Sequence, residues 1–164
     1  LSTGDALRAE KEKGTELGAE ASEYSKKGLL APDSLVSKVV TNFYLQNKSR
    51  NGILFDGYPR NKAQAIHLFS LVESSGEKIN AIIFLKVTEE ELLKRAKKRA
   101  EEQNREDDKD SKTVLTRIKE FYDSTIPAID WIKEKGIKIV EIDGNKDIDT
   151  IFKEIEKGLG SSSF

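Results

Sequence analysis

The chain has 164 residues, of which 37% are hydrophobic and 35% charged, enough for one domain with a real core and a highly charged surface. Lys and Arg number 28 and Asp and Glu 29, so a formal net charge of -1 points to no nucleic-acid partner and no anionic membrane. The absence of cysteine excludes disulfides and thiolate chemistry, and no apolar run approaches the roughly 18 residues of a membrane span.

The first half of the chain predicts helices with one short strand among them. Capping residues before Ala6 start a first helix, and Gly28 ends a second. Three consecutive apolar residues after a turn at 51–52 are typical of a buried strand. In chain order we expect a helix from about Ala6, a helix over Glu16–Lys27, a helix opened by Pro32, a strand over Ile53–Phe55 and a helix over Ala63–Val72.

The second half alternates strands and helices. Thr88 and Glu91 form a capping box before a charged helix, and Pro127 should bend or break a long one. In order we expect a strand over Ala81–Leu85, a helix to about Glu102, an exposed polar loop over Gln103–Ser111, the long helix, a strand over Lys138–Ile142 and a helix over Ile148–Ile155. This alternation predicts a single α/β domain, residues 1–164, whose parallel sheet carries helices on both faces in three layers.

Polar residues follow the first predicted strand without a spacer. Parallel sheets bind ligands beyond the carboxyl ends of their strands, so Asp56 would stand at the mouth of a site. Gly57 would let a ligand approach the backbone, and Pro59 would shape the turn. Arg60 would then present a planar fork suited to phosphate.

Arginine is scarce beside lysine, and its positions favour phosphate chemistry. Transfer of a phosphoryl group spreads negative charge over several oxygens, which a cage of guanidinium groups can neutralise. The alternative is that these side chains are ordinary solvated surface charges. The candidates are Arg8, Arg60, Arg95, Arg99, Arg105 and Arg117.

Four motifs occur in one order along almost the whole chain. They are Ser2-Thr3-Gly4-Asp5-Ala6-Leu7-Arg8, Gly14-Thr15-Glu16-Leu17-Gly18, Asp56-Gly57-Tyr58-Pro59-Arg60 with Gln64-Ala65, and Arg105-Glu106-Asp107-Asp108. In this the chain resembles adenylate kinase and its nucleoside monophosphate kinase relatives. The resemblance implies a fold of the P-loop kinase type and a monomeric cytoplasmic enzyme that converts ATP and AMP to two ADP. It also implies a helical AMP-binding region over about 3–48 and a short lid loop over about 103–111.

The resemblance also implies which residues hold AMP. Arg8 and Arg60 would contact its phosphate, and Gln64 would read the edge of the adenine. The remaining AMP contacts would come from Thr3, Leu29, Leu30, Ala31, Gly57, Tyr58 and Pro59.

On the ATP side, the resemblance implies that Arg95 stacks on the adenine, Arg99 reaches the phosphates and the backbone of Lys146 meets the base. Arg105 and Arg117 would bridge the transferring phosphoryl group. Asp56 would hold Mg²⁺ through water, and Asp107 and Asp108 would fasten the closed lid. The catalytic set is thus Arg60, Arg99, Arg105, Arg117 and Asp56; the spacing from Asp107 to Arg117 is one residue longer than the family pattern.

One family feature has no counterpart here, because no G-x-x-x-x-G-K-[ST] phosphate loop occurs in the chain. The chain also contains no methionine and begins with Leu1. We therefore expect roughly 25–30 further residues, one strand–loop–helix unit, before Leu1 in the complete protein. That strand would be central in the sheet, and without it this chain alone should not transfer phosphate efficiently.

Two other functions compete with an adenylate kinase. A pyrimidine monophosphate kinase would typically carry Ala in place of Thr3 and Asn in place of Gln64, although Asn61 after Arg60 favours that alternative. The other competitor is a non-catalytic module that binds AMP without turnover. The single histidine, His67, is expected at the surface or at a boundary rather than in catalysis.

Overall fold

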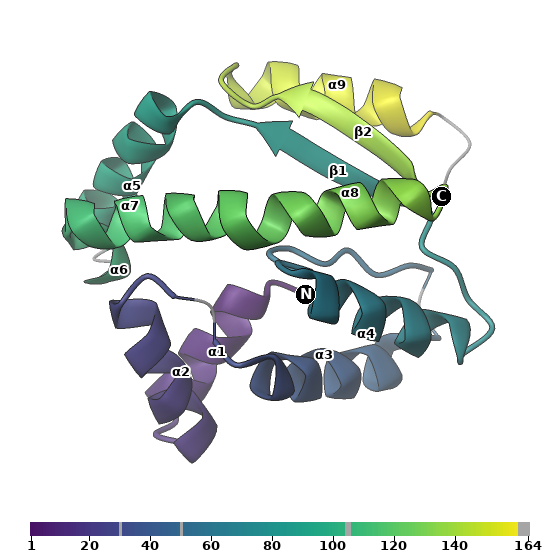
Figure 1. Ribbon diagram of the computed structural model, residues 1–164, viewed down its shortest axis with the longest axis horizontal. Coiled ribbons are helices and arrows are strands. Elements are labelled where there is room, and N and C mark those ends of the chain that lie inside the picture. The colour runs from purple at the N-terminus through teal and green to yellow at the C-terminus, as the bar shows by residue number, and fades with distance from the viewer. Residues whose placement is uncertain (30, 50, 104–105, 161–164) are drawn as a thin grey trace.

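The computed structural model describes residues 1–29, 31–49, 51–103 and 106–160. Most described residues are helical (Figure 1). The elements are α1 Thr3–Glu12, α2 Glu16–Lys26, α3 Asp33–Asn47, α4 Lys62–Glu73, β1 Ala81–Lys86, α5 Glu89–Gln103, α6 Glu106–Lys109, α7 Ser111–Glu120, η1 Phe121–Thr125, α8 Ile126–Glu134, β2 Lys138–Asp143 and α9 Ile148–Leu159. The expected helices are thus present, and the last one runs four residues further than its apolar pattern indicated.

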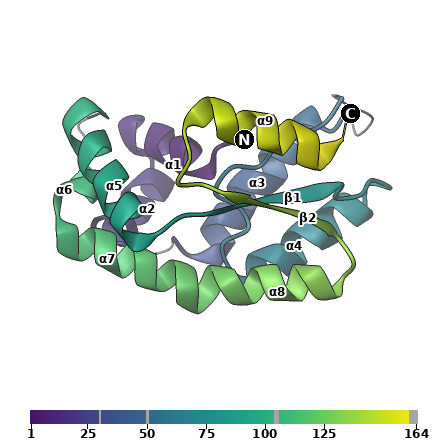
Figure 2. The same cartoon turned by 90° about the horizontal axis from the view of Figure 1, so that it is seen from above.

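The sheet of the described residues has two parallel strands. β1 pairs with β2 in a continuous register from Ala81 opposite Lys138 to Lys86 opposite Asp143. Helix α9 lies on one face and α8 on the other (Figures 1 and 2). The α8 face buries Ile132 against Phe69 of α4, as expected for a parallel sheet whose strands are covered on both sides. The α/β class and the parallel pairing are therefore confirmed.

The prediction of a buried strand over Ile53–Phe55 is wrong. The structure assigns no strand there, and the Leu54 side chain is 72% exposed. A strand needs a partner for its backbone groups, yet the only bridge described near this segment joins Ser2 to Asp56. No described strand pairs with the edge of β1 away from β2 either. The segment is nevertheless close to the N-terminus, since Asp56 N donates to Leu1 O (2.7 Å).

Helices α1 to α4 form a second packing unit below the sheet in Figure 1. Its core joins Val36, Val40 and Tyr44 of α3 to Leu68 of α4 and to Tyr58. Short polar side chains cap three of these helices: Ser2, Thr15 and Asn61 accept hydrogen bonds from Asp5 N, Gly18 N and Gln64 N. Of these caps, only the one before α1 was expected from the sequence.

The long helix predicted to bend or break at Pro127 is continuous. α7, η1 and α8 form one rod along one side of the molecule (Figure 2). The irregularity lies upstream of the proline, in the single π-helical turn η1. Proline lacks the N–H that would bond the preceding turn, and the wider turn takes up that defect without interrupting the rod.

The predicted polar loop over Gln103–Ser111 is helical in part. Residues Glu106–Lys109 form α6, and α7 begins at Ser111. Asp108 is only 4% exposed, which contradicts an exposed loop at that position. Among the described helices, none combines the length and apolar character required to cross a membrane.

Candidate functional site

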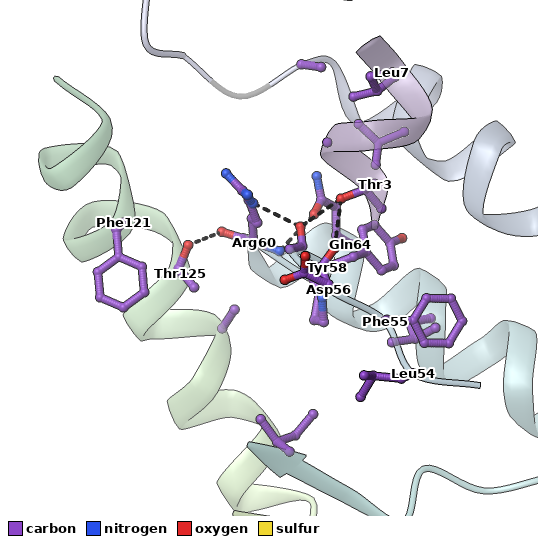
Figure 3. Close-up of a pocket in the computed structure, with 18 of the residues that line it drawn as sticks. Thr3, Leu7, Leu54, Phe55, Asp56, Tyr58, Arg60, Gln64, Phe121 and Thr125 are labelled. Carbon is purple, nitrogen blue, oxygen red and sulfur yellow. Dashed lines mark hydrogen bonds between the residues drawn. The ribbon is translucent and has the colours of Figure 1, made fainter. Parts of the chain in front are cut away.

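A cavity of about 1840 Å³ lies between α1, the segment 51–60, β1 and the rod of α7, η1 and α8. Figure 3 shows part of its lining, with Thr3, Arg60 and Gln64 converging from separate elements. Most of the residues expected from the sequence to hold nucleotides line it: Thr3, Arg8, Leu29, Ala31, Asp56, Gly57, Tyr58, Pro59, Arg60, Gln64, Arg99 and Arg117.

Thr3 joins the first helix to the segment after residue 55. It is 4% exposed, and its Oγ1 donates to Asp56 O (3.2 Å) and Gly57 O (3.1 Å). Its backbone N–H also donates to Asp56 O (3.1 Å). The start of α1 is therefore fixed against the turn that carries Arg60.

Gly57 has the backbone geometry and the space that only glycine provides. Its φ is +72°, and a Cβ there would come within 2.8 Å of Arg60 Nη2 and 3.3 Å of Thr3 Oγ1. Arg60 Nε donates to Gly57 O (2.9 Å), while Thr125 Oγ1 in the rod donates to Arg60 O (2.8 Å). The contact with Gly57 thus holds the guanidinium group at the cavity, and the contact with Thr125 holds the Arg60 backbone.

Gln64 is 2% exposed in the first turn of α4. Its Oε1 accepts from Arg60 N (2.8 Å), and its Nε2 donates to Asp33 Oδ1 (2.9 Å). Asn61 Nδ2 donates to the same Asp33 oxygen (2.8 Å), and Asn61 Oδ1 accepts from Gln64 N (2.8 Å). The amide that was expected to read a base is therefore oriented by two neighbours, Arg60 N and Asp33, and Asn61 fixes both Asp33 and the backbone N–H of Gln64.

Tyr58 and His67 link the cavity wall to α3. Tyr58 Oη is 2.8 Å from His67 Nδ1, and Thr41 Oγ1 is 3.1 Å from His67 Nε2. Burial raises the pKa of Tyr58 to about 12 and lowers the pKa of His67. The boundary position expected for His67 is confirmed, and its ring holds the Tyr58 hydroxyl in place.

The other residues expected on the AMP side are placed less tightly. Arg8 forms an ion pair with Asp5 one turn earlier in α1. Leu29 is 42% exposed at the cavity, and Ala31 is half-buried there. Leu30 lies outside the described residues.

Arg99 and Arg117 meet at one carboxylate. Asp108 Oδ2 is 3.1 Å from Arg99 Nε, and Asp108 Oδ1 is 2.6 Å from Arg117 Nη1. The Asp108 side chain is fully buried, whereas the two arginine side chains are 38% and 27% exposed. Two guanidinium groups on a buried carboxylate compensate its desolvation. Arg105 lies outside the described residues, as does the side chain of Asp107.

Arg95 and Lys146 do not line the cavity. Arg95 Nε donates to Glu91 Oε1 (2.8 Å) and its Nη2 donates to Gly144 O (2.6 Å) at the carboxyl end of β2. The hydrogen bond from Arg95 lowers the pKa of Glu91. Lys146 Nζ donates to Glu154 Oε1 (2.6 Å), which raises the pKa of Lys146. Arg95 therefore contacts the turn after β2, two residues before Lys146, and lies apart from the arginines at Asp108.

Asp56 is the metal-binding candidate, and its exposed side chain borders the cavity. In the described part of the chain, no group of three or more His, Asp or Glu residues could enclose a metal ion. A single accessible carboxylate fits Mg²⁺, which keeps most of its water ligands and takes few carboxylates.

Sequence reasoning missed the residues that orient the site. Neither Asp33 nor Thr125 had an expected role in the site. Both act across long separations, Asp33 on a side chain 31 residues away and Thr125 on a carbonyl 65 residues away. No local pattern in the sequence could have revealed such contacts.

Comparison with known proteins gives consistent results. The family model for adenylate kinase matches residues 1–137. An adenylate kinase of Phocaeicola vulgatus is 40% identical over 155 residues, which cover 94% of this chain and 81% of the relative. One from Prochlorococcus marinus (strain NATL1A) is 41% identical over 160 residues, with 98% and 84% covered, and one from Archaeoglobus fulgidus is 37% identical over 183 aligned residues, with 95% and 83% covered. The motifs, the cavity and these matches together show that the chain belongs to the adenylate kinase family.

Proposed function

We propose that the cavity binds AMP and that the reaction served is transfer of a phosphoryl group from ATP to AMP, giving two ADP. The observation that carries this proposal is the buried side-chain amide of Gln64, which lines the same cavity as Arg60 and Thr3. Its oxygen accepts a hydrogen bond from Arg60 N and its nitrogen donates one to Asp33, so the orientation of the amide is fixed. An amide of this kind suits the edge of a base, and the guanidinium group of Arg60 suits the phosphate.

In this reaction an oxygen of the AMP phosphate attacks the γ-phosphorus of ATP. The bond from that phosphorus to the β–γ bridging oxygen breaks, and the departing group is ADP. The protein mainly positions the reactants and neutralises charge. We assign Arg60 to the AMP phosphate, and Arg99, Arg105 and Arg117 to the transferring group. Arg95 and the backbone of Lys146 would flank the ATP base.

Asp56 would hold Mg²⁺ through water ligands at the mouth of the cavity. When bound, Mg²⁺ neutralises charge on the phosphates of ATP. The residues of this chain would orient the phosphates and exclude water. We further propose that the AMP-binding region spans about 3–48 and that 103–111 closes as a lid, with Asp107 and Asp108 fastening it. The family resemblance supports a monomer acting in the cytoplasm.

A pyrimidine monophosphate kinase is the second candidate, on the strength of Asn61. In the structure both ends of the Asn61 amide are engaged, one as the cap of α4 and the other on Asp33. This contact gives Asn61 a structural role and supports AMP over UMP or CMP.

The 164 residues contain no phosphate-loop motif, and the cavity is lined by residues of β1, a strand that pairs with β2 alone among the described strands. We propose that this chain alone binds AMP but forms ADP slowly. The test compares calorimetric AMP binding with a coupled ADP assay, for the chain and for a fusion with a strand–loop–helix segment carrying G-x-x-x-x-G-K-[ST] before Leu1. AMP binding by both, with rapid ADP formation by the fusion only, is expected. A fusion that folds but makes no ADP would overturn the adenylate kinase assignment of the cavity.

A further inference from the structure

The Gln64 amide is held in one of its two orientations by neighbours of fixed polarity. Arg60 N–H can only donate, so it requires the carbonyl end, Oε1. An ionised Asp33 carboxylate can only accept, so it requires the amino end, Nε2. A flip of the amide would set two donors against each other at Arg60 and two acceptors at Asp33, within a site only 2% exposed.

Asp33 is itself fixed in place. It is the first residue of α3, and its Oδ1 accepts from Asn61 Nδ2 (2.8 Å) as well as from Gln64 Nε2. The helix N-terminus favours a carboxylate at this position. The orientation of Gln64 is therefore imposed by a side chain from a different helix.

These contacts leave Gln64 with one amino hydrogen and one lone pair for a ligand in the cavity. That pair matches a base that carries an amino donor next to an unprotonated ring nitrogen, as adenine does. It does not match a 6-oxo purine, whose oxygen accepts and whose neighbouring ring nitrogen donates. A flipped amide would match the 6-oxo base instead.

We propose that Asp33 is a specificity-determining positioning residue, which makes the cavity select a 6-amino over a 6-oxo purine monophosphate by locking the Gln64 amide. This inference rests on the proposed function, in which Gln64 faces the base. It goes further in naming what discriminates AMP from IMP, two ligands that differ only at that edge of the ring.

The experiment measures AMP and IMP binding to the 164-residue chain by calorimetry. The unmodified chain should prefer AMP by about 100-fold or more, because IMP would leave buried polar groups unpaired. In Asp33→Asn the new amide can turn its amino group toward a flipped Gln64, but Arg60 N–H still opposes the flip, so only part of the preference should be lost. IMP binding should then tighten by about tenfold, while AMP binding weakens by less than about threefold.

Asn61→Ser is the matched control. Its hydroxyl can still cap α4, but the second hydrogen bond to Asp33 Oδ1 is lost. Its preference for AMP should stay within about threefold of the unmodified value, because both bonds to the Gln64 amide remain. A change equal to that of Asp33→Asn would overturn the proposal.

Other outcomes are equally decisive. An equal loss of AMP and IMP binding in Asp33→Asn means a merely structural role and rejects the inference. A preference below about tenfold in the unmodified chain rejects it without any variant. If Asp33→Asn fails to fold by circular dichroism, Asp33→Ser, whose hydroxyl both donates and accepts, is read in the same way. Absent AMP binding in the unmodified chain rejects the proposed function itself.

Discussion

The two sides of the cavity hold their polar groups in different ways. On the side of α1, α3 and α4, Thr3 and Gln64 are buried: Thr3 contacts backbone carbonyls, and Gln64 contacts the Arg60 N–H and the Asp33 carboxylate. On the side of α5 and α7, Arg99 and Arg117 are oriented by the charge of one buried carboxylate, Asp108. The first arrangement is ready for a ligand, whereas in the second a phosphate would have to share or replace an internal anion.

This difference has a physical consequence. Hydrogen bonds from backbone groups do not compete with an anionic ligand, so preorganisation on the first side costs no binding energy. A carboxylate between two guanidinium groups occupies the directions that phosphate oxygens would use. The first side should therefore bind its nucleotide in the isolated chain, and the second should bind polyphosphate weakly until Asp108 moves or loses its charge.

Arg60 provides the largest expected effect. Arg60→Gln should weaken AMP binding by about 100-fold, because it removes charge-assisted hydrogen bonds to the phosphate. The free energy of unfolding should change by less than about 0.5 kcal/mol, since the side chain is exposed. Calorimetry and urea unfolding measure the two quantities.

Arg95→Gln is the control for Arg60→Gln, because Arg95 is outside the cavity lining. It should leave AMP binding unchanged. Equal weakening by both variants would show that general positive charge, rather than a prepared site, attracts AMP, and the comparison between the two sides would fail.

Asp108→Asn tests the side of the cavity formed by α5 and α7. Removing the buried charge should lower the free energy of unfolding by about 2–3 kcal/mol, because two guanidinium groups lose their shared anion. The same change should tighten binding of tripolyphosphate, since the buried anion no longer competes with it for the two arginines. Urea unfolding and calorimetry with tripolyphosphate measure these opposite effects.

Asp123→Asn gives a matched carboxylate in the same rod, where Asp123 pairs with Lys119 at the surface. That exposed pair should contribute less than about 0.5 kcal/mol. Similar losses from the two variants, or no gain in tripolyphosphate binding from Asp108→Asn, would mean that the acid does not mask the arginines.

The smallest effect concerns His67, the one histidine of the chain. Burial lowers its pKa below the ordinary 6.5, so its NMR titration should have a midpoint under that value. The unfolded chain then takes up the proton at a higher pH than the folded chain does. Stability should therefore decline as the pH falls through 6.5, and the decline should be smaller in His67→Gln.

A titration midpoint of His67 above 6.5 would contradict burial at the Tyr58 contact. A loss of stability between pH 7 and 5.5 that is identical in the unmodified chain and in His67→Gln would assign the effect to carboxylates elsewhere. The contacts of His67 with the hydroxyl groups of Tyr58 and Thr41 would then make no measurable contribution to the pH dependence of stability.

The sequence predicted helices and strands well where neighbouring residues alone determine where an element begins or ends. Capping residues predicted the start of α1, which Ser2 caps, and Gly28 was expected to end the second helix and follows α2. The strands β1 and β2 were also predictable, because each is a short apolar run between turns. The motif order predicted most of the residues that share the cavity, although Arg95 and Lys146 do not line it.

The failures have non-local causes. Ile53–Phe55 has the composition of a strand, but pairing decides whether such a segment becomes one. Asp108 looked like a solvated loop residue, because nothing in its surroundings in the sequence indicates that Arg99 and Arg117 converge on it. The contact of Asp33 with Gln64 depends on how two helices are placed.

The π-helical turn Phe121–Thr125 sets how the side-chain faces of α7 and α8 are rotated relative to each other about the helix axis. Each residue of an α-helix advances about 100° around the axis, and a π-helical turn accommodates one residue more than an α-helical turn does. Val114 and Ile118 before it pack with Ala96, whereas Ile132 after it packs with Phe69 and the sheet. A regular α-helix built from the same residues would rotate one of these two apolar faces by about 100° toward solvent, whereas deleting one residue of the turn should restore an α-helical turn and keep both faces in place.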